Sequence, residues 1–398
     1  MNKYSEQELH KVLGQELEVP EAVEERLQTA YDQIRKKVVV QTKQSKKRYK
    51  KKYIRVLAVS AAALCTITVC AATYFIWDNR LTEKLQIDEE QQKVLEDTGM
   101  AVFSGVSCTD AGVTVTALQC ITDQYYTHLN FRVEGYTPAE GTEPGFQEVL
   151  VSVDGNTDFN WNGSFYDGLV QGNDGMPIYA DGETLQYNEQ GGIISRYTAE
   201  DGSLEYHMVL SNSAEKGFFI GKPIHVAFKN IGTMDKAECM PDLEGEWLLD
   251  WTLGGADTAR SCELEVPLGD TGAIVRAIDL SSVSIRVLYD FPRIAHTEKI
   301  DIGNGQTFEH TSYEKAPEPI GVRFKDGSSL FYIYGGPGTA GFVDETSESY
   351  INTFAFDRVI DAENVEAVLF VKEYPEGLEP IREENCYAVS LNEESNVR

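Results

Sequence analysis

Histidine can ligate a metal or act as a general base, so its spacing is the first sign of chemistry to look for. None of the chain's histidines lies in a His-Glu-x-x-His motif or a close His-x-His pair, so a zinc hydrolase is unsupported. His128, His207 and His225 fall in alternating segments opposite the apolar positions, and we expect them to face solvent on strands. The six histidines are His10, His128, His207, His225, His296 and His310.

Two segments partly match ligand-binding loops. Residues 154–163, DGNTDFNWNG, carry oxygen-bearing side chains at alternate positions, as an EF-hand loop does. However, Phe159 and Phe165 stand where that loop needs Gly and Glu, so we favour a polar loop over adventitious calcium binding. Residues 335–341, GGPGTAG, lack the Gly-Lys-Ser/Thr ending of a phosphate loop and predict a long hairpin turn.

No Gly-x-Ser-x-Gly elbow is present, and paired carboxylates cannot be told from background in so acidic a chain. We therefore predict no enzyme, no metal site and no cofactor. Cys65 and Cys70 lie in an apolar run and are expected to behave as small apolar residues. The odd number of remaining cysteines predicts free or partly paired thiols. These are Cys108 and Cys120, Cys239 and Cys262, which are the pairs closest in sequence, and Cys386.

The net charge of -29 is unevenly divided along the chain. Residues 1–55 contain 14 Lys+Arg and 8 Asp+Glu, whereas the remainder contains 21 and 56. So acidic a remainder repels phosphate backbones, which argues against direct nucleic-acid binding.

Residues 56–77 form an uncharged stretch of 22 residues. As a helix it would extend about 33 Å, enough to cross a hydrocarbon core of about 30 Å. The positive-inside rule then places the N-terminus in the cytoplasm and residues 78–398 outside. A cleaved signal peptide is the alternative, but its basic region would be 55 residues long. The residues expected to set topology and contact lipid are Lys46, Lys47, Arg48, Lys50, Lys51, Lys52 and Arg55.

The short cytoplasmic segment predicts an amphipathic helix beginning near Pro20. Its apolar face packs within a small helical hairpin, docks into a cytoplasmic partner, or does both in turn. The residues of this face are Val23, Leu27, Ala30, Ile34 and Val38.

Residues 78–98 are expected to form a juxtamembrane helical stalk, or a lid just outside the membrane. Beyond them the hydrophobic period changes to two, as at Leu129, Phe131 and Val133. Many short strands between Gly, Asn and Asp turns predict a mainly β fold with two antiparallel, immunoglobulin-like β-sandwich domains. We place these extracytoplasmic domains at 99–256 and 257–374. Residues 375–398 read as a loosely ordered acidic tail.

The chain resembles the membrane-anchored proteins of Firmicutes that carry the domain of unknown function 4179, encoded as anti-sigma factors. The likeness rests on VPEAVEERLQTAYDQIRKK, on DNRLTEKLQ leading to GVTVTALQCITDQYYTHLNFRVEGY, and on LEGEWLLDWTL. LSSVSIRVLYDF and VRFKDGSSLFYIYGG are similar to the module that often follows, of the domain of unknown function 5643 type. The resemblance implies signal transduction to transcription regulation, through a cytoplasmic helix that sequesters an ECF sigma factor. The sequence departs from the zinc-binding anti-sigma pattern, because residues 1–64 contain no Cys and a single His.

Two functions therefore stay open. In the first, the outer region binds an unknown extracytoplasmic ligand and the inner helix binds an ECF-type sigma factor. In the second, the protein binds or adheres to the cell envelope, and the N-terminal segment is only a membrane anchor. The amphipathic face ahead of the basic run favours the first, because a simple anchor does not need one.

Overall fold

The computed structural model describes residues 77–303, 306–375, 377 and 379–391. Strands make up 53% of these residues and helices 7%, which confirms the mainly β prediction with antiparallel sheets. No helix among them is long and apolar enough to cross a membrane. The amphipathic face, the basic run and all but the last residue of the predicted span lie outside the described residues.

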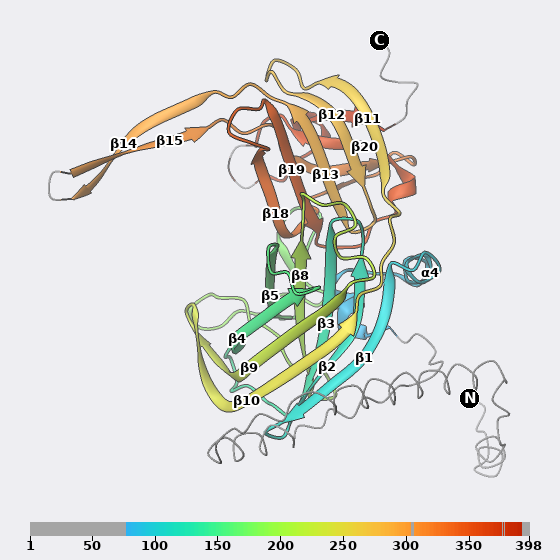
Figure 1. The fold of residues 1–398 in the computed structure, drawn as a ribbon, viewed down its shortest axis with the longest axis vertical. Coiled ribbons are helices and arrows are strands. Elements are labelled where there is room, and N and C mark those ends of the chain that lie inside the picture. The colour runs from blue at the N-terminus through green and yellow to red at the C-terminus, as the bar shows by residue number, and fades with distance from the viewer. Residues whose placement is uncertain (1–76, 304–305, 376, 378, 392–398) are drawn as a thin grey trace, which may run out of the picture. The chain divides into compact units, whose positions relative to one another are not determined.

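Two sheets make up the first β region, residues 101–252, which Figure 1 draws from cyan to yellow. They pack face to face around one apolar core, as a β-sandwich does. The order of the larger sheet is β1 (Ala101–Asp110), β2 (Val113–Thr122), β3 (Tyr126–Glu134), β8 (Leu204–Ser211) and β5 (Asn160–Phe165). The order of the smaller sheet is β10 (Glu238–Thr252), β9 (Pro223–Asp235) and β4 (Pro144–Val153), while β6 (Leu169–Gln171) and β7 (Pro177–Tyr179) pair separately.

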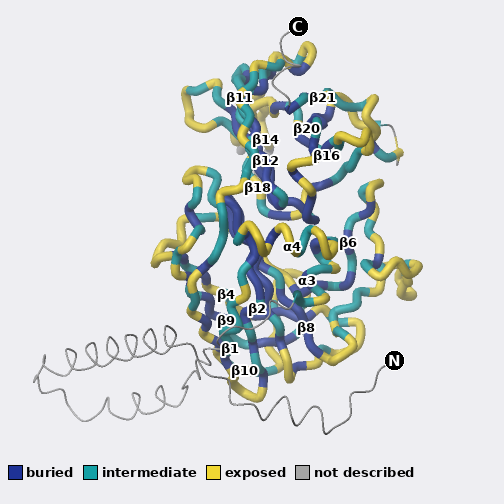
Figure 2. The backbone as a smooth tube through the Cα atoms, turned by 90° about the vertical axis from the view of Figure 1, so that its right-hand side faces the viewer, coloured by how far each residue is buried: buried dark blue, intermediate teal, exposed yellow. Residues whose placement is uncertain are grey.

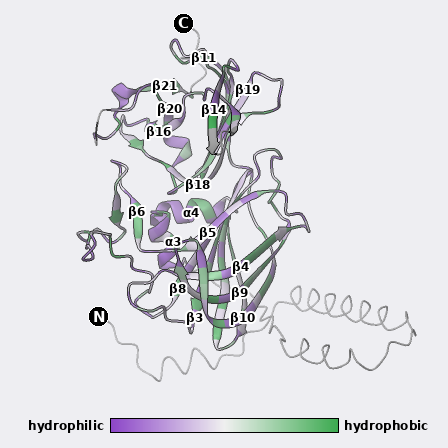
Figure 3. Cartoon of the chain, turned by 90° about the vertical axis from the view of Figure 1, so that its left-hand side faces the viewer, coloured by the Kyte–Doolittle hydropathy of each residue, from purple (hydrophilic) through white to green (hydrophobic). Residues whose placement is uncertain are grey.

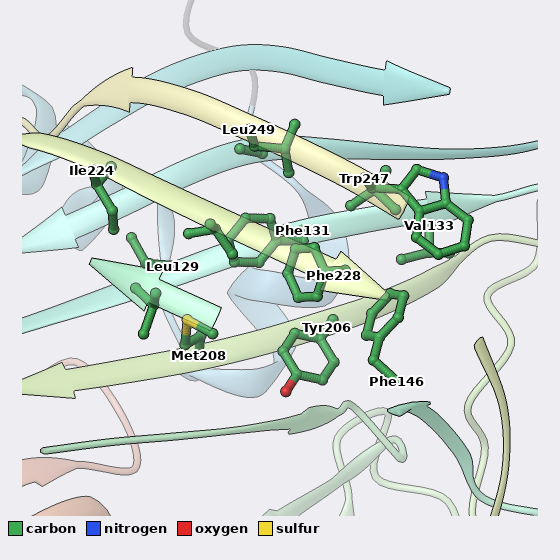
Figure 4. Close-up of a cluster of buried hydrophobic side chains, with 14 of the residues drawn as sticks. Leu129, Phe131, Val133, Phe146, Tyr206, Met208, Ile224, Phe228, Trp247 and Leu249 are labelled. Atoms are coloured by element: carbon green, nitrogen blue, oxygen red, sulfur yellow. The ribbon is translucent and has the colours of Figure 1, made fainter. Parts of the chain in front are cut away.

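The first core is rich in aromatic side chains (Figure 4). Phe131 on β3 lies edge-on to Phe228 on β9, with ring centroids 5.0 Å apart. Trp247 is fully buried and donates from Nε1 to the carbonyl of Val113, 2.9 Å away. The alternation that predicts a strand at Leu129, Phe131 and Val133 thus turns those three side chains toward the opposite sheet.

The second β region, residues 260–390, has the same two-layer arrangement around its own apolar core. Its larger sheet has the order β11 (Arg260–Pro267), β12 (Ile274–Leu280), β13 (Ser284–Asp290), β19 (Ser349–Phe356) and β18 (Tyr334–Phe342). The smaller sheet has the order β17 (Ser329–Phe331), β16 (Pro319–Phe324), β20 (Val365–Val371) and β21 (Cys386–Ser390). Short 3₁₀ turns, η1 (Ala362–Asn364) and η2 (Glu383–Asn385), precede β20 and β21. A two-stranded hairpin, β14 (Ala295–Gly303) and β15 (Gln306–Tyr313), forms a separate sheet.

Two sequence predictions are wrong in this region. The glycine-rich run at 335–341 is not a turn but strand β18, which pairs with β19. A Cβ on Gly335 would lie 2.1 Å from the backbone of Asp357, so glycine there permits a close approach of two backbone segments. The tail is not loose throughout, because residues 386–390 pair with β20 and Val389 is buried.

Two short helices, α3 (Asn79–Lys84) and α4 (Glu89–Asp97), precede β1. The side chain of Asp78 caps α3 by accepting from the amide of Leu81, and Asp88 and Gln91 form a reciprocal capping box on α4. Most of α4 is hydrophilic (Figure 3). Leu81, Leu85 and Leu95 are nevertheless buried, in a cluster with residues of both β regions. The helices are therefore packed into the β structure and do not form a free stalk.

Candidate functional site

The outer face of the larger sheet in the first β region is polar but largely covered. On β3 and β8, alternation turns His128, Asn130 and Arg132, with Glu205 and His207, away from the apolar core. Arg132 lies opposite Glu205, and Asn130 lies opposite His207. Within this sheet, strands β2, β3 and β8 are mostly buried, drawn dark blue in Figure 2, whereas β1 and β5 are mostly intermediate or exposed.

Helix α3 and the loop after β5 cover part of this polar face. The guanidinium of Arg80 donates through Nη2 to the carbonyls of Tyr166, Arg196 and Tyr197, at 2.8–3.0 Å. The same guanidinium lies 4.5 Å from the centroid of the Tyr166 ring, which in turn lies 5.8 Å from the ring of His207. Arg80 thus fixes the helix to the loop by charge-assisted hydrogen bonds.

The prediction of solvent-facing histidines is wrong for His128, which is only 5% exposed and lies near α3 and Val283 of the second β region. Burial lowers the pKa of His128 to about 4 and also holds the pKa of His207 well below its ordinary value. The Nε2 atoms of both rings are buried, with no hydrogen-bond partner among the described residues. His225 agrees with the prediction, since its side chain is 43% exposed and its Nδ1 lies 2.8 Å from Asp250.

A pocket of about 770 Å³ opens beside α3. It is bounded by the chain leading into α3, by the outer face of the larger sheet, and by the loops between β5 and β8. The side chains that line it include Trp77, Asp78, Arg80, Glu83, Phe103, Arg132, Asp181, Arg196, Glu200, Asp201 and Glu205.

The arginines of the pocket are engaged with partners inside the protein. Arg132 pairs with Asp201 and Glu134. Hydrogen bonds from Ser203, together with Arg132, lower the pKa of Asp201 to about 2. Arg196 bridges Asp181 and Glu183 at 2.7 and 2.8 Å, while its guanidinium stacks over the ring of Tyr179.

Glu205 is the unusual member of the pocket. It is 1% exposed, and neither carboxylate oxygen has a hydrogen-bond partner among the described residues. Burial raises its pKa well above the ordinary value and Asp78 acts in the same direction, whereas Arg132, Arg80 and the neighbouring amide of Asn130 oppose the shift. Burial also raises the pKa of Glu83, with Asp181, Asp78 and Glu200 adding repulsion. An unsatisfied buried carboxylate is costly, which makes this pocket a candidate binding site.

The other candidates from the sequence do not form a site. Within the described part of the chain, no group of three or more His, Cys, Asp or Glu residues could hold a metal ion. Residues 154–159 form the turn after β4, and Asn160 is already in β5. Cys108 pairs with Val115, and Cys120 pairs with Val102, so the two cysteines lie six positions apart along the hairpin. That separation is about 20 Å, which excludes a disulfide between them.

No family model and no curated protein matches the chain. Among solved structures it is similar to the conserved domain protein from Bacillus anthracis, at 13% identity and a TM-score of 0.39. That similarity covers 71% of this chain and 82% of the other.

Proposed function

We propose that this chain is a single-pass membrane regulator of the anti-sigma-factor type, in the family that carries the domain of unknown function 4179. In this proposal residues 56–77 span the membrane, and the apolar face of the preceding helix binds an ECF sigma factor. The two β regions, as immunoglobulin-like sandwiches, bind a ligand outside. The order of amphipathic helix, basic run and apolar stretch supports this topology.

One observation carries the sensory part of the proposal. The wall of the pocket includes Trp77, the last residue of the proposed span, together with Asp78 and Arg80, which follow it. Trp77 donates from Nε1 to Glu96 on α4, 2.6 Å away, so the chain leaving the span is attached to the helical pair. A ligand in this pocket would therefore contact the segment that leads to the membrane. Such contact gives two distant sites a physical means of coupling.

The second candidate, envelope binding or adhesion, is favoured by the hairpin of β14 and β15. Figure 1 shows this hairpin extending away from the sheets of the second β region. Ile300 and Phe308 on it are 42% and 57% exposed, which is the kind of apolar surface that an envelope component could cover.

Co-purification of the full-length protein with ECF sigma factors of the same cell tests the regulator. Leu27→Asp and Ile34→Asp place a charge on the apolar face and are expected to abolish capture. At 100° per residue, Gln28 and Thr29 lie on the other side of the helix, so Gln28→Asp and Thr29→Asp are matched controls that should retain it. Absence of any sigma factor from the wild-type eluate would favour the envelope-binding function.

A further inference from the structure

We propose that the pocket beside α3 binds a small organic cation of the primary-amine class, with the ammonium group placed against Glu205. The idea that this ligand is the signal for a regulator rests on the proposed function. The idea that the pocket binds it rests only on the residues of the pocket.

The first step is that two of the three arginines of the pocket are already neutralised, since Arg132 and Arg196 each pair with two carboxylates. Arg80 donates through Nη2 to three backbone carbonyls, and its Nε is buried without a partner among the described residues. An anionic ligand would have to compete for guanidinium groups that already have charged or carbonyl partners. It would also enter a pocket lined by Asp78, Glu83, Asp181, Glu200, Asp201 and Glu205, whose carboxylates outnumber the arginines.

The second step is that acceptor groups remain available. Glu205 is 1% exposed and neither of its oxygens is hydrogen-bonded within the described structure, although the residue lines the pocket. An ammonium group carries three N–H donors, so it can bond both oxygens and supply the missing charge. Glu83 and Glu200 also line the pocket and form no ion pair with any described residue. They provide acidic positions for a second amine.

The third step concerns the rest of the ligand. Phe103, 38% exposed, and Trp77 line the same pocket and offer aromatic surface. Aromatic rings attract organic cations and cover short alkyl chains. A bare divalent metal ion is disfavoured, because no set of three His, Cys, Asp or Glu ligands converges in the described chain. The pocket thus fits an amine on a short apolar body.

Isothermal titration of the full-length protein in mild detergent tests the site, with butylamine and diaminobutane as probes. We expect saturable binding of at least one amine and no binding of n-butanol, which has a similar body without the charge. Glu205→Gln keeps the shape but removes the charge, and it should weaken binding tenfold or more, as expected for a charged hydrogen bond. Glu83→Gln, on α3, should weaken the binding of diaminobutane more than that of butylamine.

Glu148→Gln is the matched control, because Glu148 is a strand carboxylate of the other sheet, paired with Lys229. It should leave amine affinity unchanged. Amine binding that is equally strong in all three variants would overturn the proposal, as would no amine binding at millimolar concentration, or calcium binding that Glu205→Gln abolishes. Amine binding without capture of a sigma factor would refute only the proposed function, and capture without amine binding only this inference.

Discussion

Replacing Asp123 should reveal how strongly the two β regions are joined. This residue lies in the turn between β2 and β3 and is fully buried. Its Oδ1 accepts from the amides of Tyr125 and Tyr126, at 2.8 and 2.7 Å. Its Oδ2 accepts from the hydroxyls of Ser281 and Ser284, at the turn between β12 and β13. Burial raises the pKa of Asp123, and these four donors oppose that shift.

The magnitude follows from the donors that Asp123→Ala would leave without an acceptor. The two serine hydroxyls can turn toward each other, since their Oγ atoms are 3.4 Å apart. The two backbone amides have no comparable substitute, and each orphaned buried donor costs about 1–3 kcal/mol. The loss is therefore about 4 kcal/mol, which lowers the melting temperature by about 8–16 °C at roughly 2–4 °C per kcal/mol. Asp123→Asn retains an acceptor for the amides and should cost less.

Thermal unfolding of the full-length protein, followed by circular dichroism, measures this loss. Asp326→Ala is the control, because Asp326 also accepts from an amide and a hydroxyl, both of Ser328, but in an exposed turn. We expect it to change stability by less than about 1 kcal/mol. Equal melting temperatures for the Asp123→Ala and Asp326→Ala variants would refute the reasoning that burial makes the Asp123 contacts costly to lose.

Four further predictions concern packing and pH. Trp247→Ala should destabilise the first β region by about 3–5 kcal/mol in urea unfolding, because Trp247 is fully buried in its core and alanine would leave a cavity. Gly232→Ala should destabilise by about 1–3 kcal/mol, because its Cβ would lie 2.0 Å from a carbonyl oxygen of β10, whereas Gly341→Ala, with open space around it, should be near neutral. Since burial lowers the pKa of His128 from 6.5 to about 4, stability should fall as pH drops through that window, and His128→Gln should flatten the fall. The pH dependence from Glu205 has the opposite sign. Because burial raises the pKa of Glu205 above its ordinary value of 4.5, this residue lowers the stability of the folded protein as pH rises above that value. Glu205→Gln should therefore be more stable than wild type at neutral pH.

The strands of the first core were predictable because side-chain direction along a strand is a local property. Leu129, Phe131 and Val133 alternate in the sequence and all face the core. The same alternation correctly predicts that His128 lies on the other face of the sheet, but the prediction that this face is exposed to solvent is wrong. Helix α3 and a distant loop cover it, and no local pattern states which segments will lie over a sheet.

The pairing of strands that are distant in the sequence could not be predicted from the sequence either. β3 pairs with β8, and β13 pairs with β19, with long insertions between the partners. The strand β18 looks like a loop in isolation because it is rich in glycine, and the short strand β21 is easily missed because the tail around it is polar and acidic. They become strands only because β19 and β20 supply the hydrogen-bonding edges.

The sequence by itself determined the mainly β character of residues beyond 99, the charge asymmetry and the prediction of a membrane span, since periodicity and composition need no partner. Only the tertiary structure decided which carboxylate would be buried without a hydrogen-bond partner. Glu205 is one of 64 acidic residues and has no distinguishing neighbour in the sequence. It is set apart by the strand opposite, the helix above and the loops beside it, and desolvation depends on all three together.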